Sequence, residues 1–281
     1  MLRNRIYRNS IISFLLAAII YGCSTGINLF SDKDEVALGN DLVKQILANP
    51  KEFPVSSADL ALKNYLTTNI LNPILASSSV KKRSIYKYRL EVIRRDDVLN
   101  AFALPGGPVF VYTGLLKYLD SEAALAGVIA HEIAHIESRH ATRRLSANYG
   151  VSLLLSLVLG QNPSALAEIA TNLFVGLAFL ANSRSDEDQS DKLSVEYLKS
   201  TKYYPGGVKF FFEKMKKDGT VSSNSSKVAT FLSTHPDPIQ RIEVVNKNLQ
   251  AQGLPLYDFT SNESSLFRTA YKMNILSRVN K

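Results

Sequence analysis

The sequence predicts an α+β fold in which helices predominate and a few strands precede a long central helix. Residues 31–50 and 56–75 repeat apolar side chains with helical periodicity, residues 85–114 are rich in β-branched and aromatic types, and an apolar helical pattern begins at Asp120. With 281 residues, 46% of them hydrophobic, the chain is long enough for one domain with a sizeable core. Two domains are the alternative.

The first residues of the chain resemble an export signal. Three arginines precede an uncharged apolar segment at 11–20, and small residues surround Cys23. The residues before Cys23 also resemble a lipobox, so we expect residues 1–22 to be a lipoprotein-type signal peptide and Cys23 to carry a lipid. An uncut membrane anchor is the alternative, but the apolar segment is shorter than the ~20 residues that span a membrane.

The charge and the single cysteine narrow the class of protein. With Cys23 alone no intramolecular disulfide can form, so the exported domain depends on its core or on a metal ion. The formal net charge of +8 falls by three, to +5, when Arg3, Arg5 and Arg8 leave with the signal peptide. The remaining positive residues are dispersed, so we expect no nucleic-acid binding and some attraction to an anionic membrane surface.

The elements before the central helix have recognisable ends. The first helical segment opens with Ser31 and acidic residues and closes at Pro50. Within the β-rich region, the Pro-Gly-Gly-Pro sequence at 105–108 predicts a hairpin-like turn. We expect a single domain over residues 23–281, with its core at about 32–256 and a basic C-terminal tail at 257–281.

The helical pattern that follows Asp120 and Ser121, two N-cap candidates, contains His131, Glu132 and His135. Residues four apart share one helix face, so both imidazoles can converge on one point with Glu132 beside them. Two neutral imidazoles and a third ligand hold a catalytic zinc ion, and a glutamate can take the proton of its water. Two surface histidines with an incidental glutamate are the alternative, which the apolar flanks disfavour.

The third ligand must lie elsewhere in the chain. The metzincin pattern requires glycine at 138 and histidine at 141, where this chain has Ser138 and Ala141. His140 points away from the metal if the helix continues past it. Further along the chain, the acidic segment at 183–191 offers carboxylates.

Glu187 and Asp191 in that segment again lie four residues apart. We expect Glu187 to be the third zinc ligand, and Asp191 to accept the free N–H of a ligating histidine, with His131 the expected donor. The alternative is a solvated acidic helix start, stabilised by the helix dipole, because Asp186 and Asp188 share the turn.

Three motifs in order resemble one enzyme family. HEIAH at 131–135, SRSDEDQSD at 183–191 and HPDPIQR at 235–241 are similar to elements of the zinc metallopeptidases that include CAAX prenyl endopeptidase, HtpX and BepA. Gln189 and Ser190 depart from the usual acidic residue and alanine. The resemblance, over roughly residues 97–245, implies a mostly helical zincin-like gluzincin fold with a small sheet beside the HEXXH helix, one Zn²⁺ per chain and endopeptidase activity. Lipoprotein-type members match the N-terminus best.

Asn100, Ala101, Phe102 and Ala103 resemble the family's edge strand beside the catalytic helix. An edge strand binds an extended peptide through main-chain hydrogen bonds, which suits a protease that acts on unfolded polypeptide with little sequence selection. An ordinary hairpin strand is the alternative.

His235 follows a Ser-rich stretch at 222–227, which we expect to be a loop. Resemblance to BepA-type members implies that His235 occupies the open zinc position and holds the enzyme inactive until substrate moves it. Arg241 would steady the site or a transition-state oxyanion. A plain loop-to-helix junction, marked by Pro236 and Pro238, is the alternative for His235.

Apolar segments at 151–160 and 165–182 raise the possibility of an intramembrane protease. A single crossing between His135 and Glu187 would separate the ligands, so both segments would have to cross. Ten helical residues span ~15 Å against a hydrocarbon core of ~30 Å, so we expect a buried or membrane-leaning helical hairpin instead.

The sequence therefore predicts a zinc endopeptidase that degrades unfolded or misassembled proteins. We expect it to be lipid-anchored in the bacterial cell envelope and to face the periplasm on the outer membrane, with the envelope assembly machinery as a candidate partner. The alternative is an envelope chaperone or assembly factor in which zinc is structural. Structural zinc sites usually have four Cys or His ligands, and this chain lacks those cysteines.

Overall fold

A computed structural model describes residues 28–55, 59–147, 182–220, 226–261 and 263–280. The expected signal peptide with Cys23, nearly all of the expected helical hairpin and most of the Ser-rich stretch lie outside these residues, so those predictions stay predictions.

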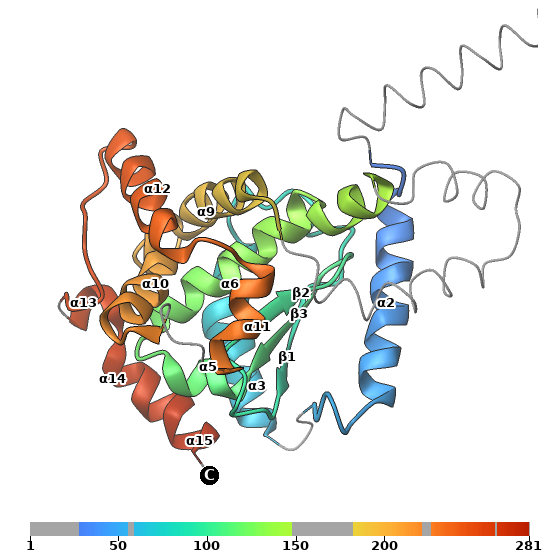
Figure 1. Cartoon of the computed structure of the whole chain (residues 1–281), viewed down its shortest axis with the longest axis horizontal. Helices are drawn as coiled ribbons and strands as arrows, with labels where there is room; N and C mark the ends of the chain where they lie inside the picture. The colour runs from blue at the N-terminus through green and yellow to red at the C-terminus, as the bar shows by residue number, and fades with distance from the viewer. Residues whose placement is uncertain (1–27, 56–58, 148–181, 221–225, 262, 281) are drawn as a thin grey trace, which may run out of the picture.

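The described part of the chain is mostly helical and has one three-stranded sheet, which confirms the α+β prediction (Figure 1). The helices are α2 (Asp32–Ala48), α3 (Leu60–Leu66), η1 (Thr67–Leu71), α4 (Asn72–Leu75), α5 (Thr113–Tyr118), α6 (Glu122–Glu137), α9 (Arg184–Leu198), α10 (Gly207–Lys217), α11 (Ser226–Thr234), α12 (Pro238–Ala251), α13 (Glu263–Leu266), α14 (Arg268–Tyr271), η3 (Lys272–Leu276) and α15 (Ser277–Val279). The strands are β1 (Arg89–Ile93), β2 (Ala101–Ala103) and β3 (Pro108–Tyr112).

The sheet has the order β1-β3-β2, with β1 parallel and β2 antiparallel to β3. The predicted hairpin turn joins β2 to β3, and the Leu104 amide donates to the Pro108 carbonyl at 2.8 Å. Gly106 and Gly107 have φ of 75° and 124°, and a Cβ on Gly106 would lie 2.6 Å from the Val36 Cα. Gly106 therefore allows the turn to approach α2, and Gly107 allows it to approach the backbone of Lys87 and Tyr88. The sheet order leaves β2 at an edge.

Local caps begin the helices where the sequence predicts. Ser31 forms a capping box with Asp34 at the start of α2, and the Ser121 side chain accepts the Ala124 amide at the start of α6. Helix α6 is buried from its first turn to Ile136. It packs closely on α10 because Gly127 carries no Cβ, which would lie 2.0 Å from the Val208 nitrogen.

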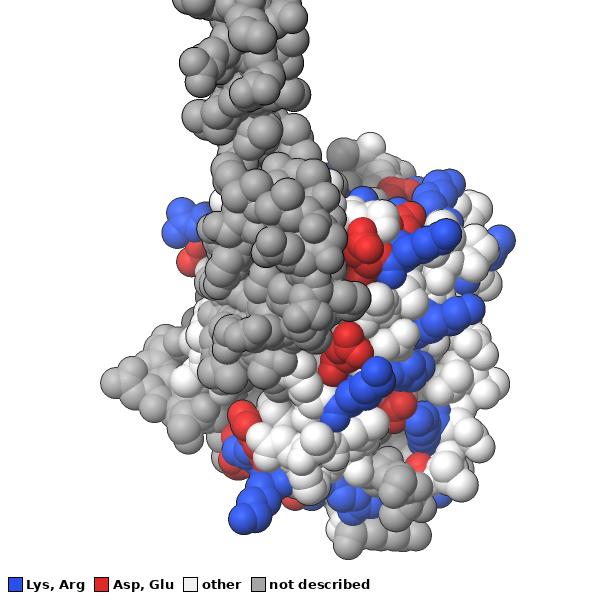
Figure 2. Space-filling view, turned by 90° about the vertical axis from the view of Figure 1, so that its right-hand side faces the viewer, with Lys and Arg blue, Asp and Glu red and all other residues white. Residues whose placement is uncertain are grey.

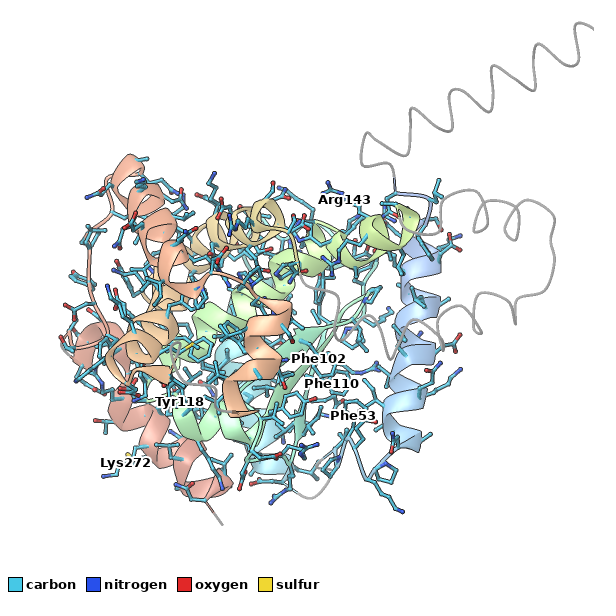
Figure 3. The ribbon with its side chains drawn as sticks, in the orientation of Figure 1. Phe53, Phe102, Phe110, Tyr118, Arg143 and Lys272 are labelled. Atoms are coloured by element: carbon cyan, nitrogen blue, oxygen red, sulfur yellow. The ribbon has the colours of Figure 1, made fainter. Side chains whose placement is uncertain are left out.

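Among the described residues, two hydrophobic clusters hold the sheet and the helices together. The smaller one lies between the sheet and α2, where Phe53 and Phe110 are buried and Phe102 stacks on Phe110 with ring centroids 5.1 Å apart (Figure 3). The larger one surrounds α6 and includes Tyr271 and Ile275 from the C-terminal segment. The residues expected as a basic tail at 257–281 thus contribute to the core, because α14 and η3 carry apolar side chains that pack on it. The domain boundaries themselves stay a prediction.

Two features concern contact with a membrane: the distribution of charge on the surface, and the length and hydropathy of the helices. On the face drawn in Figure 2, Lys and Arg are interspersed with acidic and uncharged residues. Among the described helices, none combines the length and the hydropathy that crossing a membrane requires.

Candidate active site

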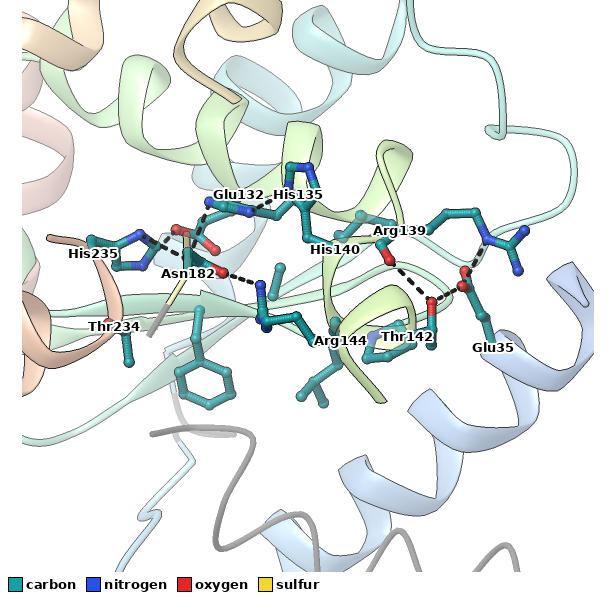
Figure 4. A pocket seen from close by; sticks show the side chains of 16 residues that line it. Glu35, Glu132, His135, Arg139, His140, Thr142, Arg144, Asn182, Thr234 and His235 are labelled. Carbon is teal, nitrogen blue, oxygen red and sulfur yellow. Dashed lines mark hydrogen bonds and ion pairs between the residues drawn. The ribbon is translucent and has the colours of Figure 1, made fainter. Parts of the chain in front are cut away.

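Four buried side chains from three parts of the chain meet at one point. They are His131 and His135 on α6, Glu187 on α9, and His235 just after α11, and each offers a ligand atom within 4.8 Å of all the others. Their exposed fractions are 3%, 8%, 1% and 4%. Figure 4 shows His135, Glu132 and His235 facing the same space. Buried groups of this kind need partners, so their convergence defines a candidate metal centre.

The donor atoms fit a zinc ion. The His131 Nε2 lies 2.9 Å from the His135 Nε2, and these nitrogens lie 3.4 and 3.2 Å from the Glu187 carboxylate oxygens. A tetrahedral ion with bonds of ~2.0–2.1 Å sets its ligand atoms about 3.3–3.4 Å apart. Two imidazoles and one carboxylate are also a known ligand set for catalytic zinc. The residues present therefore suit that ion in chemistry. The two distances to the carboxylate suit it in spacing as well, whereas the two imidazole nitrogens lie closer together than bound ligands would.

Helix α9 brings Glu187 and Asp191 against α6. The Ser183 side chain caps α9 in a capping box with Asp186, which leaves the next residue, Glu187, facing α6. Asp191, one turn later, is fully buried, and its Oδ1 lies 2.9 Å from the His131 Nδ1. The Asp191 oxygen thus takes the ring nitrogen of His131 that faces away from the cluster.

Arg241 on α12 links the two carboxylates. Its Nε and Nη2 donate to the Asp191 oxygens at 2.8 and 2.7 Å, and its Nη1 lies 2.6 Å from the Glu187 Oε2. Burial by itself raises the pKa of both carboxyls, but Arg241 outweighs it and holds the pKa of Asp191 below its usual range. The pKa of Glu187 lies well below its usual range for the same reason, with added effects of His235 and His131. Both acids are therefore ionised where they meet the histidines.

Glu132 lines the cleft beside the cluster without belonging to the metal-binding set. It is 3% exposed, and its Oε1 lies 3.5 Å from the His235 Nε2. Burial raises the pKa of its carboxyl. Glu132 is therefore an acid whose proton affinity is increased next to the candidate metal centre.

The cleft runs from the cluster along the hairpin. Phe102 and Ala103 of β2 line it, together with the Leu104 and Pro105 that follow. Asn100 is buried, and its side chain accepts the Ala101 amide at 3.0 Å, so this residue fixes the start of the strand. The edge strand thus forms one wall of the cleft that contains Glu132.

We expected His140 to point away from the metal if the helix continued past it, and that condition is not met: His140 lies outside the ligand cluster but contacts one of its members. His140 is 1% exposed, and its Nδ1 lies 2.8 Å from the His135 Nδ1. The reason is that α6 ends at Glu137 and Arg139 adopts a left-handed conformation with φ of 59°, so the helix does not continue unbroken.

Sequence reasoning also missed Asn182. Its side-chain Nδ2 lies 3.5 Å from both the His135 Nε2 and the His235 Nδ1. Its backbone N–H donates to the Thr234 carbonyl at 3.0 Å. Asn182 therefore ties the segment that carries His235 to the start of α9. The signal in the sequence is its position directly before the SRSDEDQSD motif at 183–191.

Comparisons with known proteins agree with this geometry. The model of Peptidase family M48 matches residues 61–249. The mitochondrial metalloendopeptidase OMA1 of Schizosaccharomyces pombe is 28% identical over 257 residues, which are 85% of this chain and 73% of the relative. The β-barrel assembly-enhancing protease of Yersinia pestis is 28% identical over 264 residues, which are 91% of this chain and 51% of the relative.

A third relative, OMA1 of Saccharomyces cerevisiae, is 34% identical over 155 residues, or 53% of this chain and 43% of the relative. The chain thus spans about half the length of the Yersinia relative and less than half of the Saccharomyces one. The family match covers the HEXXH helix, both carboxylates on α9 and Arg241. The chain belongs to peptidase family M48 and is a metalloprotease.

Proposed function

We propose that this protein is a zinc-dependent endopeptidase that degrades unfolded or misassembled proteins in the bacterial cell envelope. The observation that carries the proposal is the convergence of His131, His135 and Glu187 beside the buried Glu132. Those three residues would hold zinc, which would supply Lewis-acid chemistry and lower the pKa of a water to about 7.

Each residue of the site has one task in this proposal. His131, His135 and Glu187 hold the ion, and Asp191 fixes the ring of His131. Glu132 is the general base: it takes a proton from the attacking water and passes it to the leaving amine. Arg241 keeps Glu187 and Asp191 ionised and in place.

The hairpin wall of the cleft supports a peptide substrate. Strand β2 pairs on one side with β3, and Phe102 and Ala103 line the cleft. An extended polypeptide can add to such an edge through main-chain hydrogen bonds, which are independent of its sequence. Unfolded chains present such segments, whereas folded ones conceal them in their own sheets.

Replacing the general base tests the mechanism. Glu132→Gln should keep the zinc ion, because Glu132 is not in the ligand set, and should lose at least about 10²-fold in the cleavage of casein. The matched control is Glu243→Gln, at an exposed position of α12, which should leave both unchanged. Casein cleavage by Glu132→Gln at the wild-type rate would overturn the mechanism and favour the chaperone alternative.

The cellular location rests on the N-terminal sequence. The named relatives include both bacterial β-barrel assembly-enhancing proteases and mitochondrial enzymes, and the lipobox-like residues before Cys23 favour a bacterial lipoprotein. We therefore propose a lipid anchor at Cys23 that faces the periplasm on the outer membrane, near the envelope assembly machinery. Cys23→Ala should release the protein from membranes or block its maturation. Unaltered fractionation and mass of that variant would remove the anchor.

His235 is proposed as a gate on the metal. Its Nδ1 lies 3.1 Å from the Glu187 Oε2 and its Nε2 3.5 Å from the Glu132 Oε1, so the ring stands between the third ligand and the proposed base. The water that attacks the peptide bond would have to occupy the same position as this ring. His235→Ala should retain zinc and cleave casein faster or digest itself, whereas His131→Ala should lose both metal and activity. Loss of zinc, or wild-type turnover, in His235→Ala would contradict the gate.

A further inference from the structure

The two ring nitrogens of His135 face different partners. The Nε2 faces the metal cluster, 2.9 Å from the His131 Nε2 and 3.2 Å from the Glu187 Oε1. The Nδ1 faces the opposite way and lies 2.8 Å from the Nδ1 of His140, a hydrogen-bond distance. Both rings are buried, at 8% and 1% exposure. The Ser190 hydroxyl oxygen also lies near the His140 Nδ1, but at 3.5 Å it is the more distant of the two partners.

The backbone break after α6 creates the contact. In an unbroken helix with 3.6 residues per turn, a residue five positions on lies about 140° around the axis from the first, and His140 would face away from His135. Arg139 interrupts the helix with a φ of 59°. Its Nε donates to Glu35 Oε1 at 2.8 Å and its Nη2 to the Phe30 carbonyl, so α2 and the residue before its N-cap hold the break.

The position of the protons follows from the chemistry of imidazole. Two nitrogens 2.8 Å apart share one proton, with one ring as donor and the other as acceptor. If His135 binds the ion through Nε2, its neutral ring carries the proton on Nδ1 and donates it to His140. His140 then carries its own proton on Nε2, which lies 3.0 Å from the Gln189 Oε1 and 3.3 Å from the Asp186 Oδ1. Both of these oxygens are acceptors, so the chain of hydrogen bonds is consistent.

We propose that His140 is a positioning residue that accepts the Nδ1 proton of His135 and so aims the Nε2 of that ring at the metal. It does for His135 what the Asp191 carboxylate does for His131, but as a neutral acceptor. A carboxylate draws a ring proton more strongly than an imidazole does, so His131 is the more basic of the two nitrogen ligands. The inference rests on the proposed zinc site.

The first test uses the unmodified protein. In the zinc-loaded full chain labelled with ¹⁵N-histidine, two-bond ¹H–¹⁵N spectra should show His135 protonated at Nδ1 and His140 at Nε2. The reverse tautomer at either ring would overturn the inference. A wild-type protein that binds no zinc would instead contradict the proposed function, so the two failures are distinguishable.

The second test separates hydrogen bonding from packing. His140→Phe keeps a planar ring without an acceptor, and its zinc affinity in competition with a chromophoric chelator should fall about 10–100-fold. His140→Asn places an amide oxygen near the original Nδ1, and its zinc affinity should stay within about threefold of wild type. A packing role predicts the opposite ranking, and that ranking, or equal affinities, would overturn the inference. Circular dichroism of the metal-free variants checks their folding, and if the Phe variant does not fold, the spectra of wild type and the Asn variant decide.

Discussion

Two buried glutamates contact the segment of chain that carries the HEXXH motif, and their surroundings differ in kind. Glu35 on α2 is fully buried and accepts hydrogen bonds from four donors: Asn28, Tyr86, Arg139 and Thr142. Glu187 also has a cationic partner in Arg241, but its oxygens face the Nε2 atoms of two histidines. Figure 4 shows the Glu35 cluster at one end of the cleft, His235 at the other, and His135 and His140 between them.

The difference lies in the balance of donors and acceptors. Around Glu35, every partner is a hydrogen-bond donor, so the protein satisfies this carboxylate by itself. Around Glu187, nitrogen lone pairs and carboxylate oxygens converge on the same space, which leaves a place that a cation fills. Burial of an acidic residue is common to both clusters and does not identify a metal site. A metal site is identified instead by an excess of hydrogen-bond acceptors over donors.

The largest effect on stability should come from removing the Glu35 carboxylate, whose hydrogen bonds all come from donors of the protein itself. Glu35→Ala should lower the free energy of unfolding by about 3–5 kcal/mol, because Arg139 loses a buried partner, while the purified variant still binds zinc. Urea unfolding and zinc content measure the two parts. Asp41→Ala, at a half-buried site of the same helix, is the control and should change little. A Glu35→Ala protein with wild-type stability would break the comparison.

Removing the metal should lower the stability of the protein through the cluster around Glu187. If free zinc is first present at 100–1,000 times its Kd, chelating it should lower the free energy of unfolding of the wild-type protein by about 2.7–4.1 kcal/mol. Thermal unfolding with and without chelator measures this. His131→Ala should not respond to added zinc. An unchanged unfolding temperature in the wild type would show that the converging acceptors need no cation.

A smaller effect should follow from Asp191→Asn. The amide keeps the shape of the side chain but loses the charge that holds His131 and Arg241, so zinc affinity should fall about 10–100-fold. Chelator competition measures the affinity, with Asp188→Asn on the same helix as the control. Equal affinities in the two variants would remove Asp191 from the site.

The smallest effect concerns Asp32, at the solvent side of the Glu35 cluster. A hydrogen bond from Lys82 at 2.8 Å lowers the pKa of this carboxyl. Because the folded-state pKa is below the unfolded one of ~3.9, the contribution is present above that pH and is lost as the pH falls through the folded value. Asp32→Asn should therefore cost about 0.5–1 kcal/mol at pH 7 and progressively less at pH 3 and below. Urea unfolding at both pH values checks this, and a pH-independent difference would rule out the charge as its cause.

The sequence alone was sufficient wherever the signal is local. Helical periodicity placed His131 and His135 on one face and paired Glu187 with Asp191, because a spacing of four residues determines which side chains share a helix face. Ser31 and Ser121 marked helix starts, and Pro-Gly-Gly-Pro marked the hairpin, since caps and turns depend on a few adjacent residues.

Only the tertiary structure decided which of these faces meet and where the pattern breaks. The contact of His140 with His135 depends on the left-handed Arg139, whose partner Glu35 lies 104 residues earlier in the chain. Asn182 joins the site through the Thr234 carbonyl, 52 residues later in the chain. No local periodicity encodes such contacts, because they arise from the packing of distant elements, and the orientation of a buried side chain follows from the partners that packing supplies.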